Sequence, residues 1–572
     1  MTTLAIWHGY LLSATGSNIY TYELVQSWVR AGHDVVLACQ DAKPELHPSV
    51  HDVVRLKLDT VTGESRIADR RSVRQPEPGE GRCTVVIVDI GGVLPVYVLD
   101  RYAGFEVLRL IDMSAAQRER YALAHASAMR WVLAATPELA GVLINHAAPL
   151  PAALAPVLLE AGVPYTVKVH GSELEYAIVE DATLVAPTAA ALATAVSVLV
   201  GSAHIERRTA ELLGADSIAG RTAIVPPGVD LARFRPIAHD ARGDLHESLV
   251  GLLENRAKQQ PQGRTPKTSF AIEQHVEVIR GDVDSAATLL PMLTGLAGTY
   301  EERHVERFAS REVSAIDVAG SARVIVYVGK LIPQKGVQLL LAALPEVLDA
   351  NPGAHLVIAG FGPLRDGLDA LLMAMQAGDV AALDALAAHM GELSGEGTGE
   401  LVHLTAWLAE LRATDTLQAW LAAAARVRIV ERVSWLGLVD HDVLAMLWPL
   451  AEVSVVPSEL AEAFGMVAAE AAACGAVPVV ADHSGLADAA AVIEQQGVEP
   501  IRFALDAPGG AVAGLRDALL ARLALPMEER ARQAAAAREN VANAWGWDQL
   551  AAQVATLMTG GRGEQTPPAS AR

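Results

Sequence analysis

The stretch TLAIWHGYLLSATGSNIYTYELVQSWVRAGHDVVLAC, residues 3–39, decides the class of fold. An apolar run of strand length comes first, and a glycine-bearing loop follows it. A segment with helical apolar spacing then ends at Gly32, a residue suited to a helix C-cap, before the next strand-like run begins at Asp34. This alternation predicts an α/β domain with a parallel sheet that is covered on both faces.

The same alternation recurs along the chain in two blocks. The first block continues through CTVVIVDI, GVLINHA, YTVKVHG, SVLVGSA and TAIVPPGVD. The second block consists of ARVIVYVGK, AHLVIAGFGP, RVSWLGLVD, AEVSVVPSE and AVPVVADHS, with helix-like stretches between them. We therefore predict two doubly wound, Rossmann-like domains facing a central cleft, with ligands at the carboxyl ends of the strands.

The boundaries of these domains follow from changes in the pattern. We expect an N-terminal domain at residues 1–235 and a C-terminal domain at residues 321–540. Residues 236–320 are polar and irregular in period, which indicates an insertion or linker that carries some helix. An Ala- and Leu-rich connection at about 370–430 predicts a long helical insertion, and residues 541–572 predict a crossover helix followed by a disordered tail.

Composition and charge narrow the function classes. With 572 residues and a net charge of −22, the chain lacks the basic footprint of a nucleic-acid-binding protein. Its three cysteines, Cys39, Cys83 and Cys474, share no metal-ligand spacing, which favours a reducing, cytoplasmic compartment. We expect no signal peptide and no transmembrane segment; the uncharged residues 182–203 are interpreted as a buried helix that leads into a buried strand.

Two glutamates stand eight positions apart in EAFGMVAAE, Glu462 to Glu470. In one helix they would lie about 80° apart around the axis and about 12 Å along it, which suits two groups that hold opposite ends of an elongated ligand. The pattern instead predicts a strand and a loop as far as Gly465, then a helix that ends at Gly475. A chance pair, with one glutamate favoured by the helix dipole, is the alternative.

This boundary predicts an anion site. The backbone N–H groups around Gly465, Met466 and Val467 would start the helix and favour a phosphate. In YVGKLIPQKG, Lys330 and Lys335 follow another strand and could neutralise a departing diphosphate. The alternative is a solvated loop with two ordinary lysines.

Taken together, these motifs resemble the family 4 retaining glycosyltransferases (glycosyl transferases group 1), which have the GT-B fold. The resemblance rests, in chain order, on ATGSN, VKVHGSELE, VPPGVDLARFRP, VGKLIPQKGV, IAGFGP and PSELAEAFGMVAAEAAACGAVPVVADHSG. These motifs span well over half of the chain and leave out both long insertions and the tail. The last motif, with two glutamates around Phe-Gly, is the specific one.

The resemblance implies a role for each donor-site residue. Glu462 would contact the hydroxyls of the donor sugar, and Glu470 would contact the ribose. Lys330 and Lys335 would hold the diphosphate. The family usually has arginine at the position of Lys330; lysine keeps the charge but loses the bidentate fork, so the geometry of the donor phosphates stays open.

Two further residues are implied in the N-terminal domain. His170, in VHGSE, would lie near the donor sugar and the reaction centre, although a hydrogen-bonded histidine at a strand end is the alternative. Gly16, in the first loop, would let the backbone approach the phosphates or the acceptor closely. Many relatives have a Gly-Gly pair where this chain has TGSN, so the acceptor contacts stay open.

No metal and no cofactor are expected, apart from a nucleoside diphosphate sugar as the donor substrate. The triplet at Asp282–Asp284 lies in the polar insertion, and the triplet at Asp440–Asp442 is interpreted as the start of a helix, where Asp caps well. We therefore interpret both triplets as structural or solvated rather than as cation sites.

These observations predict a metal-independent, retaining glycosyltransferase that moves a sugar to an acceptor hydroxyl by a same-face mechanism. The alternative is a non-catalytic nucleotide-sugar-binding or scaffold protein of GT-B fold. The base would be contacted by the backbone around Gly437. Peripheral contact with a membrane, the donor sugar, the base, the acceptor and the oligomeric state are left open.

Overall fold

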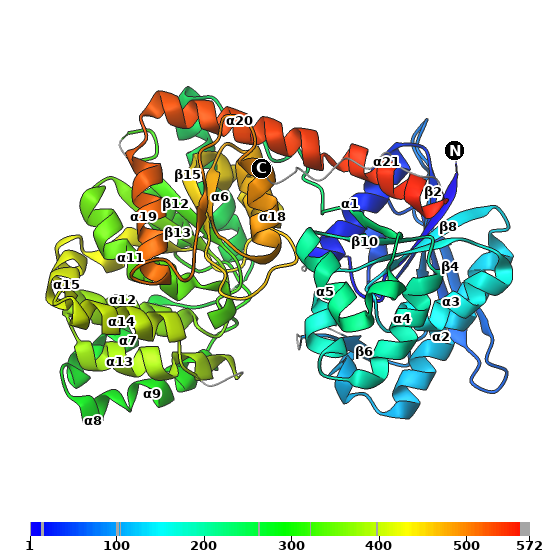
Figure 1. Cartoon of the computed structure of the whole chain (residues 1–572), viewed down its shortest axis with the longest axis horizontal. Helices are drawn as coiled ribbons and strands as arrows, with labels where there is room; N and C mark the ends of the chain where they lie inside the picture. Colours follow the sequence, from blue (N-terminus) through cyan, green and yellow to red (C-terminus); the bar gives the residue numbers. More distant parts are fainter. Residues whose placement is uncertain are drawn as a thin grey trace. The chain divides into compact units, whose positions relative to one another are not determined.

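The computed structural model describes residues 2–12, 16–98, 102, 104–260, 263–320, 322–395 and 399–560. The chain divides into two compact units (Figure 1). The first unit consists of Met1–Gly228 with Trp545–Arg572, and the second consists of Val229–Ala544. The expected tail beyond residue 560 lies outside the described residues.

The first unit is built on a nine-stranded sheet with the order β11-β10-β9-β8-β1-β2-β5-β3-β4. All neighbouring strands are parallel except the β3–β4 pair. The sheet strands are β1 (Thr3–Trp7), β2 (Asp34–Cys39), β3 (Asp52–Leu58), β4 (Ser65–Ser72), β5 (Cys83–Ile87), β8 (Leu139–Asn145), β9 (Tyr165–Lys168), β10 (Ser197–Val200) and β11 (Thr222–Ile224). A separate parallel pair joins β6 (Val93–Val96) and β7 (Glu106–Arg109).

Helices cover this sheet, as the sequence alternation predicts. They are α1 (Gly16–Arg30), α2 (Ala115–Ala135), α3 (Leu150–Ala161), α4 (Val185–Thr194), α5 (Ala203–Leu213) and α21 (Trp547–Met558). Gly32 follows α1 with φ at +81°, the left-handed conformation expected of a C-cap glycine. The last helix returns to this unit, where the Trp28 indole donates to the carbonyl of Ala551 at 2.9 Å.

The second unit contains a six-stranded parallel sheet with the order β14-β13-β12-β15-β16-β17. Its strands are β12 (Arg323–Val328), β13 (Ala354–Ala359), β14 (Val433–Trp435), β15 (Ala451–Val456), β16 (Val477–Ala481) and β17 (Arg502–Phe503). Helices α11 (Val337–Ala350), α16 (His441–Leu447), α17 (Met466–Ala473), α18 (Ser484–Ile493), α19 (Ala511–Ala524) and α20 (Met527–Trp545) complete the α/β pattern.

Both expected insertions pack into the second unit. Residues 236–320 form α6 (Arg242–Lys258), α7 (Pro266–Ile279), α8 (Val283–Ala286), α9 (Leu289–Ala297) and α10 (Ala309–Ser314). The Ala- and Leu-rich connection forms α12 (Arg365–Ala377), α13 (Val380–His389), α14 (Val402–Ala413) and α15 (Leu417–Arg426). Apolar residues of both segments, including Ile272, Leu293 and Leu408, join one buried core with the β12 and β13 strands. The polar segment is thus an integral part of this unit rather than a linker.

One part of the first sheet differs from the sequence expectation. The hairpin of β3 and β4 adds an antiparallel edge to an otherwise parallel sheet. Its outer strand, SRIADRRS, is almost entirely exposed, so it lacks the apolar run by which a buried strand is recognised. Charged side chains on such an edge also oppose pairing with other chains.

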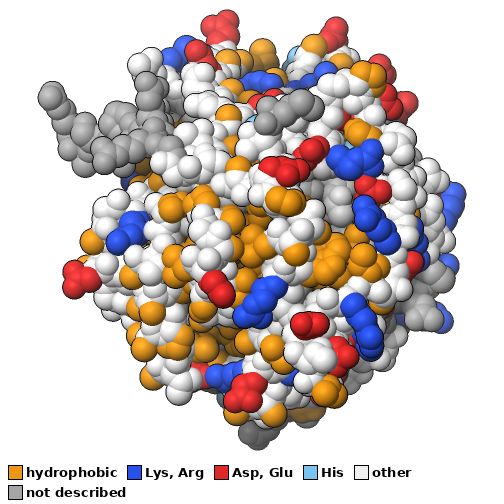
Figure 2. Space-filling view, turned by 90° about the vertical axis from the view of Figure 1, so that its right-hand side faces the viewer, with side chains coloured by type: hydrophobic (Ala, Val, Ile, Leu, Met, Phe, Trp, Pro, Cys, Tyr) orange, Lys and Arg blue, Asp and Glu red, His pale blue; other side chains and the backbone are white. Residues whose placement is uncertain are grey.

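The apolar residues 182–203 form the helix α4 followed by the buried strand β10, as expected. In the described part of the chain, no helix is long and apolar enough to cross a membrane. On the face shown in Figure 2, hydrophobic side chains gather in the middle, and Lys, Arg, Asp and Glu side chains surround and interrupt them.

Candidate active site

The loop after β12 carries the two predicted cations. Gly336 follows Lys335 with φ at +66°, and a Cβ atom there would lie 1.8 Å from the carbonyl oxygen of Pro457. Only glycine allows this approach, which brings the β12–α11 loop against the loop that follows β15. As a result, Lys335 and Glu462 meet although they stand 127 residues apart.

Glu462 lies in the loop before α17 and not in a helix, as predicted. Its Oε1 accepts a hydrogen bond from the Lys335 ammonium and another from the Ser458 hydroxyl, at 2.6 Å. The side chains of Lys335 and Glu462 are 34% and 22% exposed. The pair is therefore ordered by contacts within the protein and still accessible to a ligand.

The backbone around Glu462 is fixed from the start of α18. The Ser484 hydroxyl accepts from the N–H of Glu462 at 2.9 Å, and the carbonyl of Glu462 accepts from the N–H of Gly485 at 2.9 Å. His483 donates from Nε2 to the carbonyl of Ser458 at 2.8 Å. A Cβ atom on Gly485 would lie 2.4 Å from the carbonyl oxygen of Ala463, so this position requires glycine. No local pattern in the sequence indicates this support.

The helix α17 begins at Met466, with Gly465 as its N-cap. Its backbone bonds start with the N–H of Ala469 donating to the carbonyl of Gly465 at 3.0 Å. The preceding N–H groups, including those of Met466 and Val467, belong to the first turn, which has no carbonyl partner within a helix. The predicted helix boundary is confirmed, and Gly475 follows the helix with φ at +89°.

Glu470 lies inside α17 and is 6% exposed. Its carboxylate is 3.7 Å from Nε2 of His441, the first residue of α16. Burial lowers the pKa of His441, with a further contribution from Arg233. The second glutamate of the pair thus faces the loop after β14, whereas Glu462 faces the loop after β12.

Lys330 stands at the beginning of the cation loop and is half-buried. Its carbonyl accepts a hydrogen bond from the Tyr327 hydroxyl at 3.0 Å. Burial raises the pKa of Tyr327, and the charge of Glu462 raises it further. Lys335 is paired with Glu462, whereas Lys330 forms no ion pair among the residues that the structure describes. The Lys330 ammonium is therefore the more available of the two to an anionic ligand.

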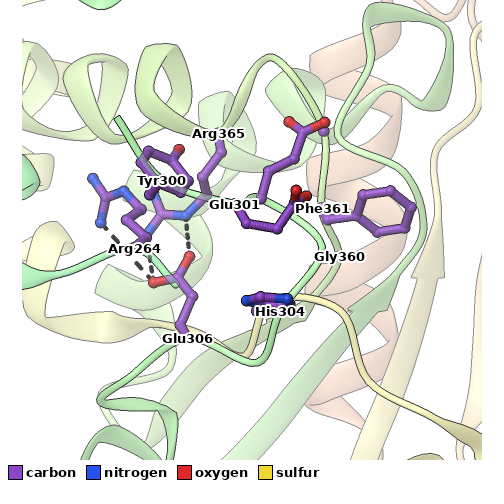
Figure 3. A pocket seen from close by; sticks show the side chains of 11 residues that line it. Arg264, Tyr300, Glu301, His304, Glu306, Gly360, Phe361 and Arg365 are labelled. Atoms are coloured by element: carbon purple, nitrogen blue, oxygen red, sulfur yellow. Dashed lines mark hydrogen bonds and ion pairs between the residues drawn. The ribbon is translucent and has the colours of Figure 1, made fainter. Parts of the chain in front are cut away.

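A small, open pocket lies beside these loops, at the carboxyl ends of β13 and β14 (Figure 3). Two of its lining residues, Gly360 and Gly362, approach the cation loop so closely that a Cβ atom would lie 2.2 Å from the Gly329 carbonyl oxygen and 2.6 Å from that of Leu331. The remaining lining residues are Arg264, Tyr300, Glu301, Glu302, His304, Glu306, Phe361, Arg365 and Gly437.

The backbone on either side of Gly437, where a base contact was predicted, forms hydrogen bonds within the protein. The carbonyl of Leu436 accepts from the N–H of Glu306 at 2.8 Å, and the N–H of Leu438 donates to the carbonyl of His304 at 3.0 Å. A segment of the polar insertion therefore pairs with this loop as an isolated β-bridge. No local pattern predicts this pairing, since the two segments lie more than 100 residues apart.

In the first unit, His170 follows the strand β9. Its Nε2 donates to the side-chain carbonyl of Asn145 at 3.0 Å, and its backbone N–H donates to Glu173 at 2.9 Å. Burial, followed by the nearby His146, lowers the pKa of His170 well below its ordinary value. His170 is thus a hydrogen-bonded histidine at a strand end, and burial favours its neutral form.

Glu173 organises this buried group. The carboxylate is fully buried and accepts from Nδ1 of His146 at 3.2 Å and from the N–H of Ala147 at 3.0 Å, in addition to His170. The rings of His146 and His170 lie 4.5 Å apart. Asn145 donates to the Thr21 hydroxyl at 2.8 Å, which ties the group to α1. The motif HGSE alone does not indicate this role for Glu173.

The remaining expectations concern Gly16 and the two acidic triplets. Gly16 is the first residue of α1, and residues 13–15 of its loop lie outside the described residues. The side chain of Asp440 accepts from the N–H groups of Asp442 and Val443, each at 3.1 Å, so the predicted cap is confirmed. In the described residues, no group of three or more His, Cys, Asp or Glu side chains could hold a metal ion. The side chain of Asp284 lies outside that description.

Parts of this chain match known protein families and relatives. Residues 322–396 and 418–538 match family models described as "Glycosyl transferases group 1". The chain is 29% identical over 245 residues to a glycogen synthase of Mycobacterium tuberculosis, covering 42% of this chain and 44% of that protein. It is 30% identical over 247 residues to a GDP-mannose-dependent alpha-(1-6)-phosphatidylinositol monomannoside mannosyltransferase of the same organism, covering 42% and 48%. These matches span less than half the length of each relative.

The fold has a solved counterpart. The catalytic domain of starch synthase IV from Arabidopsis thaliana, bound to ADP and acarbose, matches with a TM-score of 0.53 at 12% identity over 98% of both chains. The fold is therefore that of the GT-B glycosyltransferases, as predicted. Within that class, the second unit carries the sequence pattern of the glycosyl transferases of group 1, and the resemblance inferred from the motifs is confirmed.

Proposed function

We propose that this protein is a retaining glycosyltransferase that moves a sugar from a nucleoside diphosphate sugar to an acceptor hydroxyl. The observation that carries the proposal is the contact of Lys335 with Glu462 at the carboxyl end of the second sheet, with Glu470 on the helix that follows. It joins a cation suited to a diphosphate and a carboxylate suited to sugar hydroxyls. Parallel α/β sheets bind ligands at this edge.

Each group has a distinct role in holding the donor. Lys330, Lys335 and the first turn of α17 would hold the diphosphate, because ammonium groups and helix-start N–H groups both favour anions. Glu462 would accept hydrogen bonds from the sugar hydroxyls, and Glu470 would accept them from the ribose. A carboxylate accepts at two oxygens, and the contacts of Glu462 with protein donors involve Oε1.

The Lys335–Glu462 contact has a chemical consequence. The ammonium orients the Glu462 carboxylate before the donor arrives. As the bond between sugar and phosphate breaks, negative charge grows on the leaving diphosphate, and Lys335 stabilises that charge. The donor's own departing phosphate would then take the proton of the acceptor hydroxyl, so the new bond forms on the face from which the diphosphate leaves.

We assign the acceptor to the first unit. His170 would lie near the donor sugar and the reaction centre as a neutral hydrogen-bonding group, since burial lowers its pKa well below its ordinary value. Gly16, at the start of α1, would allow close approach of a ligand to the backbone. We propose that the reaction needs no metal, and a cytoplasmic location agrees with three buried cysteines that are all free.

A donor panel tests this proposal. The purified full chain would be incubated with UDP-, GDP- and ADP-sugars, first without added metal and then with chelator, while release of the nucleoside diphosphate is followed. Glu462→Ala removes the sugar-binding carboxylate. Glu247→Ala removes an exposed glutamate of α6 and serves as the matched control.

We expect the nucleoside diphosphate to be released from one donor, with or without chelator. Glu247→Ala should retain this release, and Glu462→Ala should lose it. Product analysis by NMR would then show the retained anomeric configuration. Release that chelator abolishes would overturn metal independence alone. Tight binding of a nucleotide sugar without turnover, with every acceptor class offered, would favour a sensor or scaffold of the same fold. Absence of binding to any donor would overturn the proposal.

A further inference from the structure

Ser484 has an unusual backbone conformation at the start of α18. Its φ is +54°, in the left-handed region that strongly favours glycine, because a Cβ atom there crowds the following carbonyl oxygen. The Ser484 hydroxyl also accepts a hydrogen bond from the N–H of Glu462, in the candidate active site. Strain of this kind persists only where the surrounding structure enforces it, and it is often found at functional sites.

The position of Ser484 in its helix does not explain the strain. In the described part of the second unit, the other non-glycine residues with left-handed φ are Asp415 and Arg428. Each follows the C-cap of a helix, where one left-handed residue commonly closes the last turn. The N–H of Asp415 accordingly donates to the carbonyl of Arg412 at 3.2 Å. Ser484 instead begins a helix, so its conformation has another cause.

The backbone of Glu462 is held by Ser484 and by the residue that follows it. The N–H of Glu462 donates to the Ser484 hydroxyl at 2.9 Å. The carbonyl of Glu462 accepts from the N–H of Gly485 at 2.9 Å, and a Cβ atom on Gly485 would lie 2.7 Å from that carbonyl oxygen. Two consecutive residues at the start of α18 therefore bind both backbone polar groups of Glu462.

The Ser484 hydroxyl continues into a hydrogen-bond circuit. Because Nε2 of His483 donates to the Ser458 carbonyl, Nδ1 of the neutral ring is an acceptor. The Ser484 hydroxyl lies 3.1 Å from that Nδ1 and donates to it. The Ser458 hydroxyl in turn donates to Oε1 of Glu462 at 2.6 Å. The circuit thus runs from the backbone N–H of Glu462 to its own carboxylate, with every donor pointing the same way around it.

A hydroxyl is the group that this circuit requires. It accepts from Glu462 and donates to His483 through a single oxygen atom, whereas an ionised aspartate only accepts and glycine offers neither function. Threonine also has a hydroxyl, but a β-branched residue is a genuine outlier in the left-handed region. Serine therefore supplies the required group with the least strain, and the cost of its conformation is matched by a hydrogen-bonding role.

We infer that Ser484 is a positioning residue for the donor sugar, because it holds Glu462 in the orientation in which its carboxylate accepts hydrogen bonds from the sugar hydroxyls. The contacts of Glu462 with protein donors involve Oε1, so Oε2 is the atom that we assign to the sugar. The strain is retained because glycine, which would relieve it, would also release Glu462. This inference rests on the proposed function, since it takes Glu462 as the carboxylate that binds the sugar.

Two substitutions separate the hydroxyl from the backbone strain. Ser484→Ala removes the hydroxyl and keeps a Cβ atom in the left-handed conformation, whereas Ser484→Gly removes both the hydroxyl and the strain. Both variants should lower kcat/KM for donor turnover about tenfold or more, since a small misplacement of a binding group has this effect. In calorimetry, the Tm of Ser484→Gly should nevertheless lie about 1–3 °C above that of Ser484→Ala.

Binding measurements show whether the effect concerns the sugar. The probes are UDP-glucose, GDP-mannose and ADP-glucose, each compared with UDP, GDP or ADP alone in isothermal titrations without acceptor. For the nucleotide sugar that the unaltered chain turns over, Kd should rise about tenfold in both variants, because a hydrogen bond to a charged group is lost. The Kd of the matching nucleoside diphosphate should change less than about threefold, because that molecule has no sugar for Glu462 to bind.

Asp415→Gly is the matched control, since it changes a left-handed residue to glycine at an exposed position between α14 and α15. It should leave kcat/KM unchanged. Turnover that follows Tm, with Ser484→Gly active and Ser484→Ala impaired, would overturn the inference and leave the proposed function intact.

Two further results would also overturn the inference alone. One is turnover by both Ser484 variants within about threefold of the unaltered chain. The other is an equal loss of affinity for the nucleotide sugar and for its nucleoside diphosphate, which would indicate a general disturbance of the site. If the unaltered chain neither binds nor turns over any of the probes, the result would instead count against the proposed function itself.

Discussion

Glu462 in the second unit and Glu173 in the first are similar in position and opposite in environment. Both follow a strand of a parallel sheet, and both accept several hydrogen bonds from the protein. The Glu462 side chain is 22% exposed and is held by two side chains, whereas Glu173 is fully buried and is held largely by backbone N–H groups.

This difference separates the carboxylate that we propose to bind a ligand, Glu462, from a structural one, Glu173. An exposed carboxylate can exchange a protein partner for a ligand at little cost, since water and salt already screen its interactions. A buried carboxylate cannot lose a partner without leaving a charge unpaired in a medium of low dielectric constant. Accessibility of the bonded atoms, more than residue type or hydrogen-bond number, therefore distinguishes the two sites.

The largest effect on stability is expected at Glu173, the buried carboxylate of the two. Glu173→Ala would leave two backbone N–H groups and His146 without their acceptor, and should lower the free energy of unfolding by about 3–5 kcal/mol. Differential scanning calorimetry would record this as a fall in the Tm of the first unit. Glu462→Ala is the matched comparison and should cost less than about 1 kcal/mol. Equal losses in both variants would contradict the distinction.

Substitution at the proposed donor site should affect catalysis strongly and stability little. Lys335→Met should lower kcat/KM for donor turnover about 100-fold, because a charge that stabilises the leaving diphosphate is lost, while Tm stays nearly unchanged. Lys258→Met, which removes an exposed lysine of α6, should leave both quantities unchanged. A loss of less than about threefold at Lys335 would remove it from the proposed mechanism.

Acidification should weaken the first unit through its buried histidines. Burial lowers the pKa of His8 and His125 to about 3, and it lowers that of His170 well below 6.5. Because the folded pKa values lie below the unfolded ones, the unfolded chain binds more protons under acid conditions, so stability is complete above pH 6.5 and is lost as the pH falls below it. Each histidine should cost about 1 kcal/mol at pH 5.5.

Calorimetry at pH 7.5 and pH 5.5 would measure this loss as a fall in Tm. His239→Gln, which changes an exposed histidine, should leave the fall unchanged. A first unit whose Tm is the same at both pH values would show that these histidines do not titrate differently on folding.

The smallest effect is expected at Lys330. Lys330→Arg restores the residue type that the family usually has and offers a planar fork to a phosphate, so donor Kd should fall by about two- to fivefold. Titration with the preferred nucleoside diphosphate would measure it, with Lys258→Arg as the control. Weaker binding in Lys330→Arg would show that this loop is shaped for an ammonium group.

The sequence predicted those features that depend on local pattern. Apolar runs identified the buried parallel strands of both sheets, and glycine spacing placed the end of α1 at Gly32 and the end of α17 before Gly475. The loop position of Glu462 followed from the same reasoning. Each of these features is decided by residues within about one helix or strand length.

Features that depend on distant partners were missed. The β4 strand is exposed and charged, so its pairing with β3 leaves no apolar run to detect. The contact of Lys335 with Glu462 and the β-bridge at Gly437 join segments more than 100 residues apart. Glu173 received no role because burial of a carboxylate depends on how neighbouring elements pack and is not visible in HGSE itself.

The buried arginine Arg264, which donates hydrogen bonds to Asp366 and Asp369, has a consequence for how this protein can be divided. Family matching begins at residue 322, so a truncation chosen from sequence similarity would remove Arg264, Tyr300 and Glu306 together. Asp366 and Asp369 would then face Arg365 alone in the interior, and apolar surface of α12 would be uncovered where α7 packs on it. The family match begins at residue 322, whereas the compact second unit begins at Val229. A fragment meant to keep this unit intact should therefore start nearly 100 residues before the family match.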